Sequence, residues 1–231
     1  MVTIKNKRAK RGKQTMRRDK TKEAVSAYAG DAYDLARRTM RGLNEIRKYI
    51  NIEEKFLDTS VALTPDQSGS LQCITQLAQG TTMNTRVGNS LKVQRLEIKG
   101  RAAVASAVIS YSLVRIIVFR DMEGQGTAPA VSDLLETVGS TSAPRQPYDW
   151  LNRKRFAILY DMLVPLTALS GGQSVHVFTY SVDLGKHVLY RGTTAAAASD
   201  GEGSIYIACV SDEATNTPSV NASCRITFTD D

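Results

Sequence analysis

The stretch SLVRIIVFRD, residues 112–121, is apolar on both faces of an extended chain through its centre, VRIIVF at 114–119. A strand with one wet face alternates apolar and polar residues, so this run predicts a strand in the middle of a sandwich. The segment SCRITFT, residues 223–229, does alternate, with Cys224, Ile226 and Phe228 on one face and polar residues on the other. Both patterns favour an all-β fold.

Six further runs of strand character surround these two segments. They lie near residues 52–61, 71–77, 91–109, 155–161, 174–184 and 204–211. Gly, Ser, Thr and Pro occur in the connections, and the only helical patch between the strands is around residues 132–138. Eight strands with long loops predict one eight-stranded jelly-roll sandwich over residues 51–231.

The longest connection, residues 121–154, contains the helical patch and PRQPYDW at 144–150. Long loops at the end of a sandwich are the usual place for contacts and function. We therefore expect this loop and those near residues 62–70, 192–203 and 212–221 to lie on the outer surface.

Residues 23–50 change to a helical period. Val25, Ala32, Thr39 and Ile46 recur every seven residues, while the basic side chains fall mainly on the other sides. The segment predicts an amphipathic helix, weakened by two glycines that each cost about 1 kcal/mol relative to alanine. Its apolar stripe needs a partner, which is either its own domain or the same helix of neighbouring subunits.

Residues 1–22 form a basic arm with Asp19 as the one acidic residue. The candidate nucleic-acid-binding residues are Lys5, Lys7, Arg8, Lys10, Arg11, Lys13, Arg17, Arg18, Lys20 and Lys22. With almost nothing to bury, the arm is expected to be disordered alone. Because cations release counterions from a polyanion, the arm predicts nucleic-acid binding; the alternative is a solvated tail without a specific role. The cluster KNKRAKRGK is also typical of a nuclear-import signal.

Charge separates the arm and helix from the body. Residues 1–48 hold 15 Lys and Arg against 5 Asp and Glu, whereas residues 49–231 hold 15 against 18. A body near neutrality does not repel its own copies, so the composition allows close self-association.

The three cysteines, Cys73, Cys209 and Cys224, are odd in number and lack metal-type spacing. They predict reduced thiols packed as small core residues, as in a cytosolic or nuclear setting. No apolar run approaches the roughly 20 residues of a membrane span, and the N-terminus lacks the apolar segment of a secretory signal. We expect a soluble protein with no membrane insertion.

The sequence contains few of the residue patterns that catalytic sites use. A jelly-roll enzyme of the cupin kind needs clustered metal ligands, and the two histidines, His176 and His187, are not spaced to share a strand face beside a carboxylate pair. We predict no enzyme activity, catalytic residue, resident metal or cofactor. A calcium ion at a subunit contact is a minor alternative, with candidate ligands Asp58, Asp66, Asp161 and Asp183.

The segment QGTTMNTRVGNSLK, residues 79–92, frames one arginine with two glycines. Gly80 and Gly88 are expected to allow tight turns, and the Arg86 guanidinium to bridge loop carbonyls or a carboxylate of a neighbouring subunit. Gln79, Gly80, Arg86 and Gly88 are thus predicted to structure the loop or a subunit interface. A satisfied surface arginine is the alternative. If the prediction holds, Arg86→Ala should block assembly more than folding.

This segment resembles the region between the third and fourth strands in coat proteins of satellite tobacco necrosis virus and its relatives. It is also similar to capsid proteins of circular single-stranded DNA viruses that encode a replication initiator. The similarity extends through SLVRIIVFRD, AVSDLLE at 130–136 and NRKRFAILYD at 152–161, and covers residues 50–230 in order.

The resemblance implies a small icosahedral virion of about 60 identical subunits, with the arm pointing inward onto a single-stranded genome. DNA is favoured over RNA by the similarity across residues 112–161. The helix would lie inside the shell, bundled around a threefold axis. Synthesis in the host cytoplasm and import into the nucleus would follow.

Two other classes compete with a capsid. A cellular nucleic-acid-binding protein with a basic tail is disfavoured because the body lacks a basic face or interleaved aromatic residues. A jelly-roll enzyme or lectin is disfavoured by the two histidines and by a tail that it does not need. Self-assembly separates a capsid protein from both.

Overall fold

The computed structural model describes residues 31–43, 53–105, 111–169 and 172–230. The chain divides into two units, residues 1–52 and 53–231. In the first unit residues 31–43 are helical, inside the predicted helix, and Leu35, Met40 and Leu43 are exposed on it. The rest of the predicted helix and the basic arm lie outside the described residues. No described helix is long and apolar enough to cross a membrane.

The second unit is built from strands. They are β1 (Glu54–Leu63), β2 (Ser70–Cys73), β3 (Ser90–Ala103), β4 (Tyr111–Asp121), β5 (Phe156–Leu169), β6 (Gly172–Gln173), β7 (Val175–Leu189), β8 (Ser204–Ser211) and β9 (Ser219–Asp230). Each of the eight predicted strand regions corresponds to one of them. The two-residue β6 is an addition.

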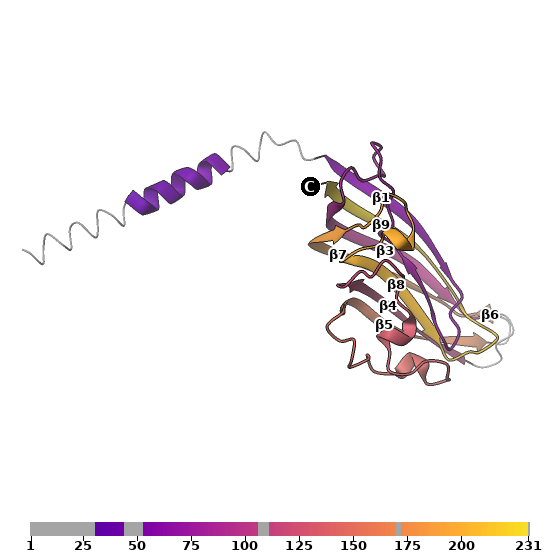
Figure 1. Ribbon diagram of the computed structural model, residues 1–231. Helices are drawn as coiled ribbons and strands as arrows, with labels where there is room; N and C mark the ends of the chain where they lie inside the picture. Colours follow the sequence, from indigo (N-terminus) through magenta and orange to yellow (C-terminus); the bar gives the residue numbers. More distant parts are fainter. Residues whose placement is uncertain (1–30, 44–52, 106–110, 170–171, 231) are drawn as a thin grey trace, which may run out of the picture. The chain divides into compact units, whose positions relative to one another are not determined.

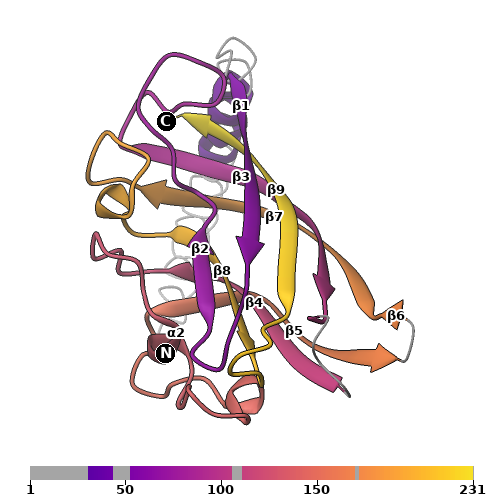
Figure 2. The ribbon, with the colours of Figure 1, turned by 90° about the vertical axis from the view of Figure 1, so that its right-hand side faces the viewer.

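The strands form two antiparallel sheets (Figures 1 and 2). The first sheet has the order β1-β9-β3-β7 and the second sheet the order β2-β8-β4-β5-β6. In the first sheet, and for the pairs β2-β8 and β8-β4 of the second, the neighbours are not consecutive strands, and the chain passes repeatedly from one sheet to the other. This is the double-sheet wrapping of a jelly roll, and the predicted fold class is confirmed.

Several predicted boundaries were wrong. β5 continues to Leu169 rather than ending at Asp161, although Pro165 lies within it. The proline is tolerated because β5 pairs with β4 along one side and only with the short β6 on the other. The helical patch is a single turn, α2 (Val131–Leu134), because Leu135 already forms a β-bridge with Tyr148.

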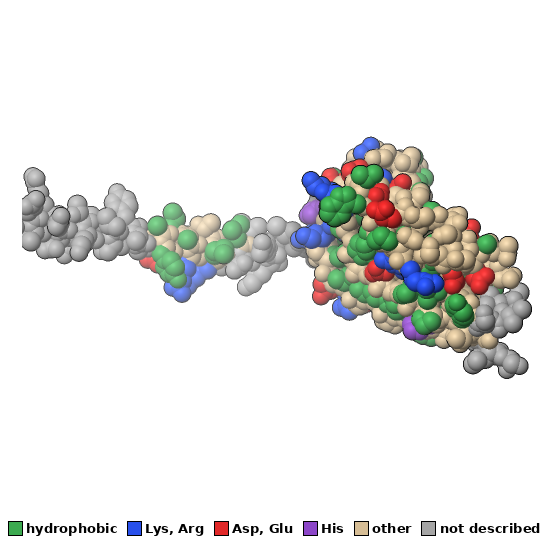
Figure 3. Space-filling model, turned by 90° about the horizontal axis from the view of Figure 1, so that it is seen from below, with side chains coloured by type: hydrophobic (Ala, Val, Ile, Leu, Met, Phe, Trp, Pro, Cys, Tyr) green, Lys and Arg blue, Asp and Glu red, His purple; other side chains and the backbone are tan. Residues whose placement is uncertain are grey.

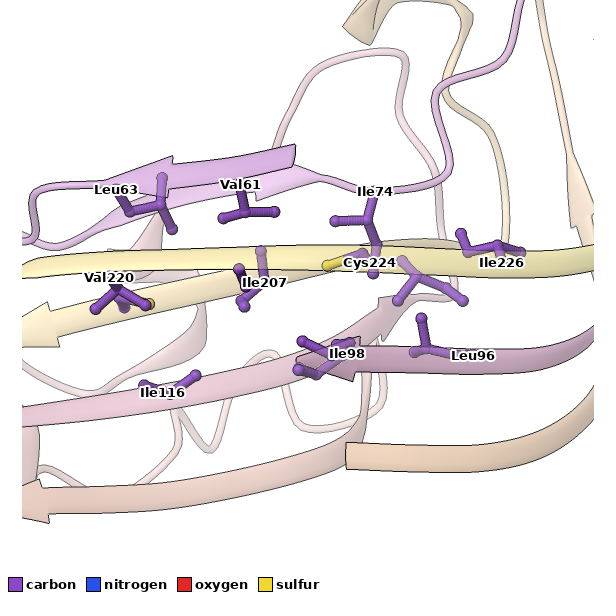
Figure 4. Close-up of a cluster of buried hydrophobic side chains, with 14 of the residues drawn as sticks. Val61, Leu63, Ile74, Leu96, Ile98, Ile116, Ile207, Val220, Cys224 and Ile226 are labelled. Carbon is purple, nitrogen blue, oxygen red and sulfur yellow. The ribbon is translucent and has the colours of Figure 1, made fainter. Parts of the chain in front are cut away.

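The main core lies between the sheets (Figure 4). Leu96 and Ile98 of β3 face Ile116 of β4 and Ile207 of β8, all without exposed area. The three cysteines are buried free thiols, as expected. Burial raises the pKa of the Cys224 thiol to about 12, so it stays protonated near neutral pH.

A smaller core covers the outer face of the second sheet. Residues 122–155, called the long loop below, include α2 and the short helix η1 (Ala143–Arg145). Val131 and Leu134 of this loop pack in one cluster with Phe119 of β4 and Tyr206 of β8. In Figure 1 the long loop lies below the second sheet. This cover explains why β4 is apolar on both faces and β8 is buried at every position.

The outer face of the first sheet is polar. Along β1 and β9 buried and more exposed positions largely alternate, and the outward residues include Asp58 and Arg225. β1 and β9 therefore have one buried and one exposed face, whereas the side chains of β4 and β8 are mostly buried on both faces.

Candidate assembly surfaces

Arg86 is fully buried between two loops. Its Nε donates a hydrogen bond to the Leu77 carbonyl at 3.2 Å, and its terminal nitrogens donate to the carbonyls of Gly88 and Gly192. The guanidinium carbon lies 4.1 Å from the centre of the Tyr190 ring, a cation–π contact. Burial lowers the pKa of Arg86 from its ordinary value. The side chain ties loop 74–89 to loop 190–203.

The other three predicted loop residues lie around Arg86. Gln79 forms a β-bridge with Arg86 and donates its backbone N–H to the Thr193 carbonyl at 2.8 Å. The N–H of Gly80 donates to the Arg86 carbonyl at 2.9 Å. Gly80 and Gly88 both lie at bends of the chain, and neither has a positive φ, so these bends do not need a glycine for their backbone conformation.

A close contact accounts for Gly80, because a Cβ there would lie 3.0 Å from the Thr85 hydroxyl. The Gly88 carbonyl accepts a hydrogen bond from Arg86, which a carbonyl of any residue could do. Burial also excludes the alternative of a surface arginine.

Lys55 is a second buried cation at this end of the sandwich, and sequence reasoning missed it. Its side chain is 4 % exposed, and Nζ lies 2.8 Å from Asp230 Oδ2 and 3.3 Å from the Thr85 carbonyl. Asp230 Oδ2 also accepts the N–H of Val87 at 3.2 Å. The pair joins the ends of β1 and β9 to loop 74–89. The sequence did contain a signal that Lys55 is buried, because period-two alternation along the strand puts it on the same face as Val61.

Arg155 and Asp121 fasten the two ends of the long loop. Arg155 Nη2 lies 2.8 Å from Asp121 Oδ2, and Nε donates to Oδ1 at 3.1 Å. The same carboxylate accepts the backbone N–H of Glu123 at 3.0 Å. Burial acts to raise the pKa of Asp121, but these hydrogen bonds outweigh it and leave the pKa below its usual value.

A second cluster fastens the middle of the long loop to β4 and β5. Arg115 donates to both oxygens of Asp161 at 2.8 and 2.7 Å, and Tyr148 donates its hydroxyl to Asp161 at 2.5 Å. Arg115 also donates to the Gln146 carbonyl at 2.6 Å. Burial opposes ionisation, yet the bonds from Arg115 and Tyr148 keep the pKa of Asp161 low. Both clusters use residues of the quoted motifs to which the sequence had assigned no such structural role.

Large apolar side chains remain exposed at several places on the body. They include Met83, Val87, Tyr111, Trp150, Leu151, Leu163, Val175 and Val177. On the face seen from below in Figure 1, hydrophobic side chains lie between charged ones (Figure 3). Exposed apolar area of this kind is available for contacts between protein chains.

The four candidate calcium ligands lie apart within one chain. Asp161 is bound to Arg115, Asp58 pairs with Arg225 at 2.7 Å, and Asp66 accepts N–H groups of its own turn. Asp183 lies 4.0 Å from Arg95. In the described part of the chain no three His, Cys, Asp or Glu side chains gather as a metal site. The ten candidate nucleic-acid-binding residues lie outside the described residues.

Comparison with known proteins identifies the family. The model of the satellite tobacco necrosis virus coat protein family matches residues 9–231. The capsid protein of Satellite tobacco necrosis virus 1 is 30% identical over 182 residues, which cover 76% of this chain and 88% of that protein. The coat protein of Maize white line mosaic Satellite virus is 26% identical over 167 residues, covering 71% and 74%.

Among solved structures, the naturally occurring empty particles of cowpea mosaic virus align with 74% of this chain and 82% of theirs, at 8% identity and a TM-score of 0.35. The chain belongs to the satellite tobacco necrosis virus coat protein family and is a viral capsid protein.

Proposed function

We propose that the protein assembles into a closed shell of about 60 identical subunits and packages a single-stranded nucleic acid through its basic arm. The observation that carries the proposal is the charge distribution of a coat-family chain, with 15 Lys and Arg against 5 acidic residues in residues 1–48 and a nearly neutral body. About 60 such arms would bring on the order of 600 positive charges together, enough to condense a small genome by counterion release.

Deletion of residues 2–22 tests the role of the arm. We expect the shortened protein to form particles that have lost most of the nucleic acid held by the full-length protein, measured by the absorbance ratio at 260 and 280 nm and by extraction. Particles of the shortened protein that hold as much nucleic acid as before would contradict the proposal.

The preference for DNA is part of this proposal and rests on the resemblance across residues 112–161. Nucleic acid extracted from virions is expected to be digested by DNase and to resist RNase. The reverse digestion would overturn DNA as the cargo and leave packaging by the arm intact.

We further propose that Arg86, with Gln79, Gly80 and Gly88, structures loop 74–89 from within one subunit. The support is that the hydrogen-bond acceptors of Arg86 are carbonyl and amide oxygens of its own chain. Because Arg86→Ala would leave buried acceptors unpaired, we expect it to destabilise the subunit itself. This differs from the expectation from sequence that assembly would be affected more than folding. Arg191→Ala, at an exposed arginine of loop 190–203, is the matched control.

Denaturant unfolding of both variants distinguishes the two roles. An Arg86→Ala subunit that unfolds like the wild type but no longer assembles would assign Arg86 to the subunit interface instead.

We also infer that KNKRAKRGK directs import into the host nucleus. Residues 1–22 fused to a fluorescent protein are expected to concentrate it in nuclei of host cells, and an even cellular distribution would contradict this.

A further inference from the structure

Trp150 and Leu151 are held out into solvent at the end of the long loop. Their side chains are 66% and 88% exposed, the latter the highest exposure among the large apolar residues that the structure describes in the body. The Arg153 guanidinium lies 3.9 Å from the centre of the Trp150 ring. Tryptophan and arginine are the residues most enriched at the energetic centres of protein interfaces.

The turn that presents these two residues is fixed by hydrogen bonds. Asp149 accepts the N–H of Leu151 at 2.9 Å and the side-chain amide of Asn152 at 2.7 Å. The same amide donates to the Asp133 carbonyl in α2 at 3.1 Å. The backbone that carries the apolar pair is therefore ordered before any partner binds, which lowers the entropy lost on binding.

A surface hollow of about 310 Å³ lies beside the N-terminal end of α2. It is lined by Gly69, Ser70, Leu71, Pro129, Val131 and Val138, among others. Its size is at the lower limit of ligand pockets, so it can receive a large side chain rather than an extended ligand. It is mainly apolar, as a site for an aromatic ring requires.

One residue that lines the hollow, Ser70, carries an unsatisfied polar atom. The hydroxyl oxygen of Ser70 is buried and has no hydrogen-bond partner among the described residues. A buried hydroxyl without a partner costs free energy, and the indole N–H of tryptophan is a donor that needs an acceptor. Rotation of the Ser70 side chain toward the hollow would let the two groups satisfy each other.

Charge around the two sites is complementary. Arg153 and Lys154 are exposed beside Trp150, while Glu136 is exposed in the segment between α2 and Val138. Opposite charges at the rim of a contact favour the correct pairing of two surfaces.

We propose that Trp150 and Leu151 of one copy insert into the hollow of a neighbouring copy. The inference rests on the proposed self-assembly and specifies one contact of it. Each copy carries both halves of the contact, the apolar pair on the long loop and the hollow between the long loop and residues 68–71. A head-to-tail contact of this kind closes into a ring when the rotation between copies allows it.

Trp150 is the only tryptophan of the chain, so its fluorescence reports this contact without labelling. Acrylamide quenching is measured on sedimented particles and on the same protein unfolded in urea. We expect quenching in particles to be several-fold weaker than in urea, with emission at shorter wavelength. Particles whose Trp150 is quenched about as strongly as in urea would overturn the contact and leave self-assembly standing. Absence of particles would instead overturn the proposed function.

A pair of introduced cysteines tests whether residue 151 of one copy lies at the hollow of another. Leu151→Cys protein is mixed with Ser132→Cys protein, assembled and mildly oxidised; Ser132 lines the hollow and is exposed. The native thiols are buried and do not compete. We expect covalent dimers from this mixture and none when Ala195→Cys, at an exposed site on loop 190–203, replaces Ser132→Cys. Equal dimer yields with both partners, or none with either, would overturn the proposal.

Discussion

The two sheets share one core but differ on their outer faces. The second sheet is covered by the long loop, so that Phe119 and Tyr206 are buried on the side away from the main core. The first sheet instead carries charged residues there, and Asp58 and Arg225 pair at 2.7 Å across β1 and β9. The difference shows that the long loop is part of the fold, whereas the outer face of the first sheet carries a polar surface in place of such a cover.

The largest expected contrast is between two phenylalanines. Phe119 faces outward from the second sheet with no exposed area, and Phe56 is 41% exposed on the first. Phe119→Ala should destabilise the subunit by about 3–5 kcal/mol through lost burial and a cavity, and Phe56→Ala by less than about 1 kcal/mol. Denaturant unfolding of both variants measures this, and equal losses would contradict the role of the long loop as a cover.

Two ion pairs give the next contrast. Asp121 is 1% exposed and pairs with Arg155, so Asp121→Asn leaves a buried guanidinium poorly compensated and should cost about 3 kcal/mol. Asp58→Asn breaks the exposed pair with Arg225, and we expect no measurable change in the free energy of unfolding. Thermal melts of the two variants are the test. A large effect of Asp58→Asn would mean that the first sheet depends on its surface charges.

Acid should act on the cover of the second sheet. The pKa values of Asp121 and Asp161 are lowered in the folded protein, so their stabilisation is present above the unfolded value of about 3.9 and is lost as pH falls through the folded values. Cleavage of the long loop by an acid-active protease should therefore rise only below about pH 4. Asp58→Asn, on the first sheet, should leave this profile unchanged. Cleavage that is equally fast at pH 6 would contradict the role of these carboxylates.

Much of this contrast could be predicted from the sequence. The run VRIIVF at 114–119 indicated a strand buried on both faces, and SCRITFT at 223–229 indicated one with a polar face; β4 and β9 have these properties. Alternation is a property of the strand's own residues, so it can be recognised in the sequence without knowledge of the partner strands. The residues that cover β4 were recognised only as a long connection.

The buried polar contacts could not be predicted in the same way. Arg86 was singled out, but its acceptor Gly192 is more than a hundred positions away along the chain. Lys55 and Asp230 come from opposite ends of the body. The Lys55–Asp230 pair depends on the register of β1 with β9, which is set by the whole sheet rather than by either segment.

The most direct test of the central claim is negative-stain electron microscopy of the full-length protein, expressed alone and purified at moderate salt. The proposed function predicts uniform closed particles of about 20 nm, the size expected for about 60 domains of this mass in one shell. Monomers or small oligomers at every salt concentration would contradict it.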